Sequence, residues 1–395
     1  IGAHHHRSGR GEFKIHLPEG VTPVPALFQK AGYHTCIGSG LLGKDHRGMD
    51  ISAGNRKAKG KAAGRAPLGK TDYNFEWDPA IYDSHDWADR GDKPFFMQVQ
   101  LHGGKLRLDS LEANRALAAR AREELGSSTD PEKVTLPPYY PRDPVLLEDW
   151  AAYLDSVRLT DHHVGQVIAR LEKEGLLENT LIIFMTDHGI SHARGKQLLY
   201  DEGTRVPFIV RGPGIPKGSV RDDLIEQIDM APTSLAAANQ PIPTAMQGRD
   251  LFAKGYQPRT HAFSARDRCD ETTEKLRSIR GERYLYIRNG HPQRPHLQPN
   301  AYKDGKAIVI ALRAAHEAGT LPSVSEDLLF SPTRPAEELY DYIEDRWQVT
   351  NLATNPQFKP ELERHRRLLD EKLAATREPA PETPAEYDSD MAEYL

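Results

Sequence analysis

The spacing of apolar residues predicts that helices and strands alternate in the first part of the chain. Apolar residues recur at steps of three and four, which indicates helices, over 22–31, 110–125, 146–174 and 228–238. Short apolar and β-branched runs indicate buried strands over 94–101, 180–186 and 207–211. Such alternation favours an α/β fold, in which a mixed, mostly parallel sheet lies between helices.

The pattern changes near Pro243–Asp250, where we expect a domain boundary. Short strand candidates and one amphipathic helix follow, over 262–266, 275–280, 283–288, 336–342 and 360–376. We therefore expect an α/β domain over 1–245 and a smaller C-terminal α+β subdomain with an antiparallel sheet over 246–377. Residues 378–395 are rich in Pro and Glu, and this composition predicts a disordered tail.

Composition narrows the class of protein. A chain of 395 residues can bury a large core, and its net charge of −5 lacks the basic excess that nucleic acids and anionic membranes attract. The longest apolar runs have the length of strands, so no membrane span is expected. Two cysteines allow neither a disulfide framework nor a CxxC metal cluster. The chain opens at Ile1, so the lack of a leader says nothing about location.

Candidate chemistry follows the strand predicted over 180–186. Asp187, His188 and Gly189 come directly after it. In α/β sheets, ligands bind outside the carboxyl ends of the strands. A carboxylate beside an imidazole is an arrangement of metal ligands. The alternative is that Asp187 caps the loop while His188 faces solvent.

The residues after this turn resemble the sulfatase family. Gly195-Lys196-Gln-Leu-Leu-Tyr200-Asp-Glu-Gly-Thr-Arg205-Val-Pro207 is similar to the family pattern Gly-Lys-x-x-x-Tyr-x-x-Gly-x-Arg-x-Pro. Further matches occur in the family's order at Ala31–Thr35, Pro94–Phe96, Asp161–Thr180, Met230–Thr233 and Ala336–Asp341. The resemblance implies an alkaline-phosphatase-like fold. It also implies a sulfuric ester hydrolase that acts on sulfated carbohydrate or aryl sulfate.

The resemblance also implies roles for residues of this turn. Asp187 and His188 correspond to ligands of a calcium ion, with zinc as the alternative because imidazole suits zinc better. Lys196 corresponds to the lysine that binds the sulfate oxygens, where its charge would stabilise the developing anion. The alternative for Lys196 is a solvated surface lysine.

An earlier lysine of the site has two candidates. The family usually has Gly-Lys-x-His soon after its Gly-Tyr-x-Thr turn. Lys70, in Gly-Lys-Thr-Asp-Tyr-Asn, matches one subgroup if residues 38–68 are an insertion. Lys44 and His46 keep the Lys-x-His spacing instead. We favour Lys70 and retain the other pair as the alternative; Lys70 could also be a plain exposed lysine.

A proton donor for the leaving alcohol is expected just after the strand over 94–101. The family has a Pro-His pair at this place, and counting from Phe95 puts Lys105 at the position of that histidine. His102 lies three residues earlier. Either side chain could donate a proton or a hydrogen bond to the leaving oxygen, so both are candidates, although a histidine at the end of a strand is often structural.

The nucleophile of the family is absent from these 395 residues. Sulfatases oxidise a Cys or Ser in a Cys/Ser-x-Pro-x-Arg motif to formylglycine, whose aldehyde hydrate attacks the sulfate ester. Neither Cys36 nor Cys269 has that context, and Phe330 precedes the Pro-x-Arg spacing without an oxidisable side chain. In family order, the motif and the first strand with two acidic metal ligands belong upstream of Ile1. We therefore expect the chain to be an incomplete, inactive fragment of a sulfatase.

That expectation gives a first prediction. The purified 395-residue chain should not turn over a chromogenic aryl sulfate, because no residue in it can supply the aldehyde hydrate. Turnover above that of a Lys196→Ala variant would contradict it.

Two other functions stay open at this point. One is a zinc phosphodiesterase or phosphonate hydrolase of the same superfamily, which would use an upstream Thr or Ser nucleophile. The other is a non-catalytic binding protein with the same fold. For a sulfatase, the resemblance suggests a periplasmic or secreted location.

Overall fold

The computed structural model describes residues 17, 19–45, 47–49, 77–269, 271–376, 383–385 and 388. The predictions on Lys70, on His46, on the insertion beyond residue 49 and on most of the tail lie outside the described residues.

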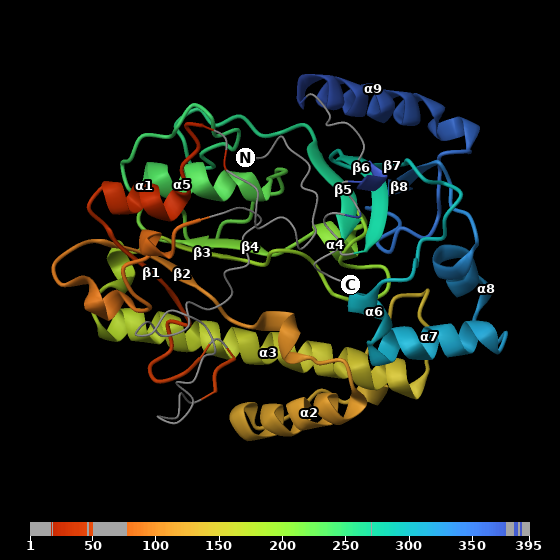
Figure 1. Ribbon diagram of the computed structural model, residues 1–395, viewed down its shortest axis with the longest axis horizontal. Coiled ribbons are helices and arrows are strands. Elements are labelled where there is room, and N and C mark those ends of the chain that lie inside the picture. Colours follow the sequence, from red (N-terminus) through yellow and green to blue (C-terminus); the bar gives the residue numbers. More distant parts are fainter. Residues whose placement is uncertain are drawn as a thin grey trace.

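The strands of the N-terminal part lie in a layer between helices (Figure 1). The layer contains β1 (His34–Gly38), β2 (Phe95–Val99), β3 (Ile182–Met185) and β4 (Phe208–Arg211). One side carries α1 (Val24–Lys30) and α5 (Met230–Ala237), and the other carries α2 (Leu111–Leu125) and α3 (Pro144–Lys173). This arrangement confirms the predicted α/β fold.

Strand pairing is mixed. β1 and β2 are parallel, with His34 opposite Phe95 and Gly38 opposite Val99. β3 and β4 are antiparallel, with Ile182 opposite Arg211. A parallel pair needs a long crossover, usually a helix. The connection from β3 to β4 contains only the one-turn α4 (Asp201–Thr204) instead of a covering helix. β1 is a strand that the apolar pattern does not predict.

Helix α3 joins the two parts of the molecule. It starts where the Asp143 side chain accepts a hydrogen bond from the Val145 amide, with Pro144 in the first turn. Its C-terminal half packs on the core around Cys36 and Leu41. Its N-terminal half packs through Leu146, Leu147 and Trp150 against Ile308, Val309 and Leu312.

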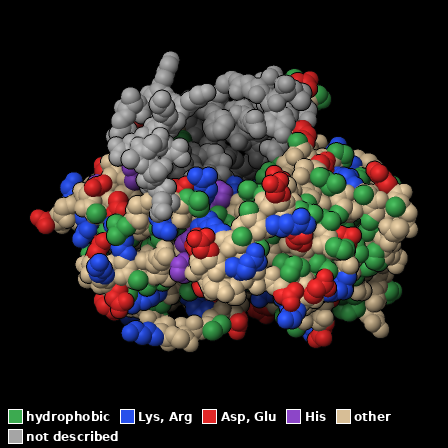
Figure 2. Space-filling model, turned by 90° about the horizontal axis from the view of Figure 1, so that it is seen from below, with side chains coloured by type: hydrophobic (Ala, Val, Ile, Leu, Met, Phe, Trp, Pro, Cys, Tyr) green, Lys and Arg blue, Asp and Glu red, His purple; other side chains and the backbone are tan. Residues whose placement is uncertain are grey.

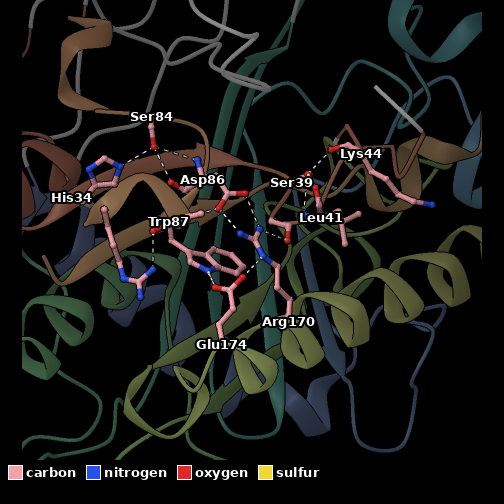
Figure 3. A network of polar contacts seen from close by, with 12 residues as sticks. His34, Ser39, Leu41, Lys44, Ser84, Asp86, Trp87, Arg170 and Glu174 are labelled. Carbon is pink, nitrogen blue, oxygen red and sulfur yellow. Dashed lines mark hydrogen bonds and ion pairs between the residues drawn. The ribbon is translucent and has the colours of Figure 1, made fainter. Parts of the chain in front are cut away.

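Arg170 fixes α3 beneath the β1 side of the layer (Figure 3). Its guanidinium donates to both carboxylate oxygens of Asp86 at 2.7 and 2.6 Å and to Glu174 at 2.8 Å. It also lies 4.0 Å from the centroid of the Trp87 ring. A two-pronged Arg–carboxylate pair is among the stronger polar contacts. The nearby Lys44 side chain points away from these ion pairs.

The C-terminal part is the predicted antiparallel sheet with a covering helix. Its strands pair in the order β5 (Ala262–Cys269), β6 (Thr272–Arg280), β7 (Tyr284–Asn289) and β8 (Glu337–Asp341). Helix α9 (Lys359–Thr376) packs on β6 and β7. Between β7 and β8 lie α6 (Ala301–Asp304), α7 (Ala307–Glu317) and α8 (Ser323–Ser325), which the sequence pattern does not predict. The boundary near 243–250 stays a prediction.

Short helical turns link these elements. They are the 3₁₀ turns η2 (Pro79–Ile81), η3 (Trp87–Arg90), η4 (Gly103–Leu106), η5 (Pro131–Lys133), η6 (Leu177–Asn179), η7 (Gln227–Asp229) and η9 (Pro356–Phe358), and the π-turn η8 (Glu326–Phe330). Of these, η4 and η7 lie next to the candidate site.

The surface has mixed charge. On the face in Figure 2, Lys and Arg side chains alternate with Asp and Glu rather than forming a field of one sign. In the described part of the chain, every helix is too short or too polar to cross a bilayer.

Candidate active site

The loop after β3 is held tightly by its own backbone. The amide of Gly189 donates to the Gly203 carbonyl at 3.0 Å, and a Cβ atom at Gly189 would collide with the Glu202 carbonyl. The Gln227 side chain of η7 donates to the carbonyls of Thr186 and Asp187 at 2.9 and 2.8 Å. Glycine is therefore needed here because the chain returns close behind the turn.

His188 is oriented as an acceptor. Its Nδ1 lies 2.7 Å from the Gly189 carbonyl, so Nδ1 carries the proton and Nε2 keeps its lone pair. Nε2 is buried, has no hydrogen-bond partner in the described residues and lies 3.4 Å from an Asp187 carboxylate oxygen. Burial, and then the charge of Lys196, lowers the pKa of His188. The ring is therefore neutral at pH 7.

Lys196 lies nine residues after Asp187 in the same loop. Its amide donates to the Ile190 carbonyl at 2.7 Å. Its ammonium lies 4.4 Å from the ring centroid of Tyr302 in α6, a residue that sequence analysis does not select. The hydroxyl of Ser191 donates to the Tyr302 oxygen at 3.1 Å. The C-terminal part thus contributes an aromatic residue to this loop.

Lys105 belongs to the same group. It lies in η4, and its charge lowers the pKa of both His188 and Tyr302. Burial alone would raise the pKa of Tyr302, but Lys196, the hydrogen bond from Ser191 and the two other lysines near it hold that pKa below its ordinary value. The structure therefore gathers Lys105, Lys196 and His188 around one region of positive charge.

The other residues predicted for the site that the structure describes are His102, Lys44 and Asp187. His102 directly precedes η4, three residues before Lys105. The Lys44 carbonyl accepts a hydrogen bond from Ser39 at 2.7 Å, near the ion pairs of Arg170 (Figure 3). Asp187 follows β3 with its side chain 72% exposed.

Sequence analysis also missed a buried ionic group under the loop. Arg107 donates to Asp149 of α3 at 2.6 Å and to the Ser191 carbonyl at 3.0 Å. Nε2 of His192 lies 2.7 Å from the same Asp149 oxygen, and its ring stacks on Trp150. These contacts tie the loop to α3. An acidic residue within the apolar stripe of a helix is the pattern that could have revealed it.

The donors of a metal site are incomplete among the described residues. In that part of the chain no group of three or more His, Cys, Asp or Glu side chains could hold an ion. The pair of Asp187 and His188 nevertheless fits a metal. Its imidazole donates its Nδ1 proton to a carbonyl and offers a buried, unpartnered Nε2, as ligand histidines do.

The cysteines do not fit the family's modified nucleophile. Cys36 lies buried in β1, and burial raises the pKa of its thiol to about 12. The sulfur of Cys269 accepts a hydrogen bond from Gln197 at 3.1 Å. Neither stands in the required motif.

Comparison with known proteins finds curated relatives that are named as sulfatases or sulphohydrolases. An ulvan-active sulfatase from Formosa agariphila is 29% identical over 78% of this chain and 56% of its own length. Human N-sulphoglucosamine sulphohydrolase is 29% identical over 62% of this chain and 51% of its own length. The chain thus spans about half the length of these curated relatives.

A solved structure shares the fold. It is a protein in complex with its substrate D-glucosamine-2-N,6-O-disulfate, 15% identical to this chain, with a TM-score of 0.56. The match covers 93% of this chain and 84% of that one. The sequence model of the Sulfatase family matches residues 2–240, more than half of the chain. This chain belongs to the Sulfatase family.

Proposed function

We propose that this chain carries the sulfate-binding loop of a hydrolase that cleaves sulfate esters of carbohydrates. The observation that carries the proposal is that Lys196, Lys105 and the neutral His188 lie together beyond the carboxyl end of β3. Two ammonium groups in a half-buried site favour an anion, and a lysine binds sulfate oxygens as a point charge. The relatives named for sulfated carbohydrates support the same substrate class.

In this proposal each residue of the chain has one task. Lys196 binds the oxygens of the sulfate group. Lys105, which stands where the family has a histidine, donates a hydrogen bond or a proton to the leaving alcohol oxygen, with His102 as the alternative donor. Lys70 remains the candidate for a further lysine of the site, with Lys44 as its alternative.

Asp187 and His188 are the proposed metal ligands. The ion would polarise a sulfate oxygen and add positive charge to the site. Calcium is the first candidate, because the family resemblance implies it and Asp187 supplies a hard oxygen donor. Zinc is the alternative, because it accepts the imidazole nitrogen readily. A periplasmic or secreted location is part of the same proposal.

Calcium binding to the 395-residue chain should be weak. Asp187 and His188 supply two ligands, whereas calcium takes six to eight oxygen ligands. We expect no rise in melting temperature at millimolar calcium. A site filled at a hundred times its dissociation constant would stabilise the fold by about 2.7 kcal/mol, and a shift of that size would show that further ligands are already in place.

Binding of inorganic sulfate tests the proposed function. We expect Lys196→Ala to weaken binding, measured by calorimetry, by about tenfold or more, because a charged hydrogen bond is lost. Lys254→Ala, which removes an exposed lysine elsewhere, is the control and should leave the affinity unchanged. Equal affinities of the wild type and both variants would contradict the proposal.

A further inference from the structure

Tyr302 stands between two lysines. The ammonium groups of Lys196 and Lys306 lie 4.4 and 4.5 Å from its ring centroid. Lys306 is buried and forms an ion pair of 2.7 Å with Asp109, so its charge is balanced. Ser191 holds the Tyr302 oxygen at 3.1 Å. Ser191 and Lys306 therefore restrain the ring on which Lys196 packs.

The residue after Lys196 is held in an unusual conformation. Gln197 has φ of +82°, which costs free energy for a side chain other than glycine. Its side chain donates to the Asn300 side-chain oxygen at 3.0 Å and to Cys269 at 3.1 Å, and its carbonyl accepts from Arg266 at 2.7 Å. All three partners belong to the C-terminal part. A residue with a strained backbone that several hydrogen bonds hold in place, such as Gln197, is typical of a functional loop.

A third contact reaches the same loop. The buried ammonium of Lys303 donates to the Ala193 carbonyl at 3.0 Å. Asn300, Tyr302 and Lys303, here called the loop clamp, thus contact residues 191, 193, 196 and 197 from one short segment.

We propose that Tyr302 of the loop clamp is a positioning residue that holds the Lys196 ammonium for sulfate, a role that rests on the proposed function of Lys196. A lysine has a flexible four-carbon stem, and fixing it costs conformational entropy. Attraction between the ammonium and the ring face offsets that cost before the ligand arrives. The Asn300–Gln197 hydrogen bond fixes the backbone from which the stem starts.

The test reads the position of Lys196 directly. Lysines of the 395-residue chain are labelled by reductive ¹³C-methylation, which keeps their charge, and the Lys196 signal is assigned by its loss in Lys196→Arg. In the wild type the ring current of Tyr302 should displace this signal from the position of exposed lysines. Tyr302→Phe keeps the ring and should keep the displacement, whereas Tyr302→Leu should abolish it. Melting curves check that both variants fold.

Binding of inorganic sulfate is measured on the same variants. Tyr302→Leu should weaken sulfate binding by about three- to tenfold, and Tyr302→Phe should weaken it less. If the Lys196 signal of folded Tyr302→Leu stays where it is in the wild type, the positioning role is wrong. If that signal moves but Lys196→Ala binds sulfate as well as the wild type, the contact between Lys196 and the Tyr302 ring stands and the proposed function fails.

Discussion

Replacing Asp149 by Ala should destabilise the protein by about 3–5 kcal/mol, the cost of leaving a buried charge without its partner. The side chains of Arg107 and Asp149 are 3% and 1% exposed, and Asp149 is also the partner of His192. Without the carboxylate, the positive charge of Arg107 stays buried, and the neighbouring His192 carries no negative charge to balance it. Unfolding in urea, followed by circular dichroism, measures the loss.

The neighbouring acid provides a matched control. Glu148 pairs with Arg115 at 2.6 Å, but the Arg115 side chain is 67% exposed. Exposed ion pairs contribute about 0–1 kcal/mol, so Glu148→Ala should have little effect. Similar losses in the two variants would show that the buried ionic group does not anchor α3 to the site loop.

Stability should fall as the pH drops from 7.5 to 5.0, because two histidines are buried in the neutral form. Burial, and then Arg107, lowers the pKa of His192 to about 4. Its Nδ1 is buried and has no partner in the described residues, so a proton there would be an unsatisfied donor. Burial also lowers the pKa of His296 to about 4.

The sign follows from proton binding. An unfolded histidine has a pKa of about 6.5, so between pH 6.5 and 4 the unfolded chain binds more protons than the folded one. The stabilisation is complete above pH 6.5 and is lost as the pH falls toward 4. At pH 5.0 each histidine should account for about 2 kcal/mol of lost stability.

Variants separate these histidines from other acid effects. The double variant His192→Gln, His296→Gln should have a flatter dependence of its unfolding free energy on pH in this window. The slope of the wild-type chain over the same window is the reference. If the double variant also keeps that slope, these two groups do not carry the effect.

The sequence predicts the parts of this molecule that depend on local pattern. The helix over 146–174 has apolar residues at every turn, and it matches α3. The sequence pattern does not predict helix α7, because Ile308, Val309 and Ile310 form a continuous apolar run that fits a strand equally well. Strand β1 is not predicted either, because the polar residues His34 and Thr35 interrupt the apolar pattern, although both are buried in the structure.

Some residues of the candidate site could likewise be predicted from the sequence, and others could not. Asp187, His188 and Lys196 could be selected because they share one short segment with a recognisable spacing. Tyr302 comes more than a hundred residues later in a stretch without a pattern, and only the fold brings its ring to Lys196. Asp149 stands out only as an acid within the apolar stripe of α3, and Arg107 looks like an ordinary surface charge until packing buries it.

The central claim is that Lys196 binds the sulfate group, and the position of a bound anion tests it most directly. Crystals of the 395-residue chain soaked in selenate would locate the anion by anomalous scattering from selenium. We expect a selenate whose oxygens lie about 2.7–3.2 Å from the Lys196 ammonium, on the side of His188 and Lys105. A selenate bound only at other lysines, with Lys196 free of the anion at saturating concentration, would contradict it.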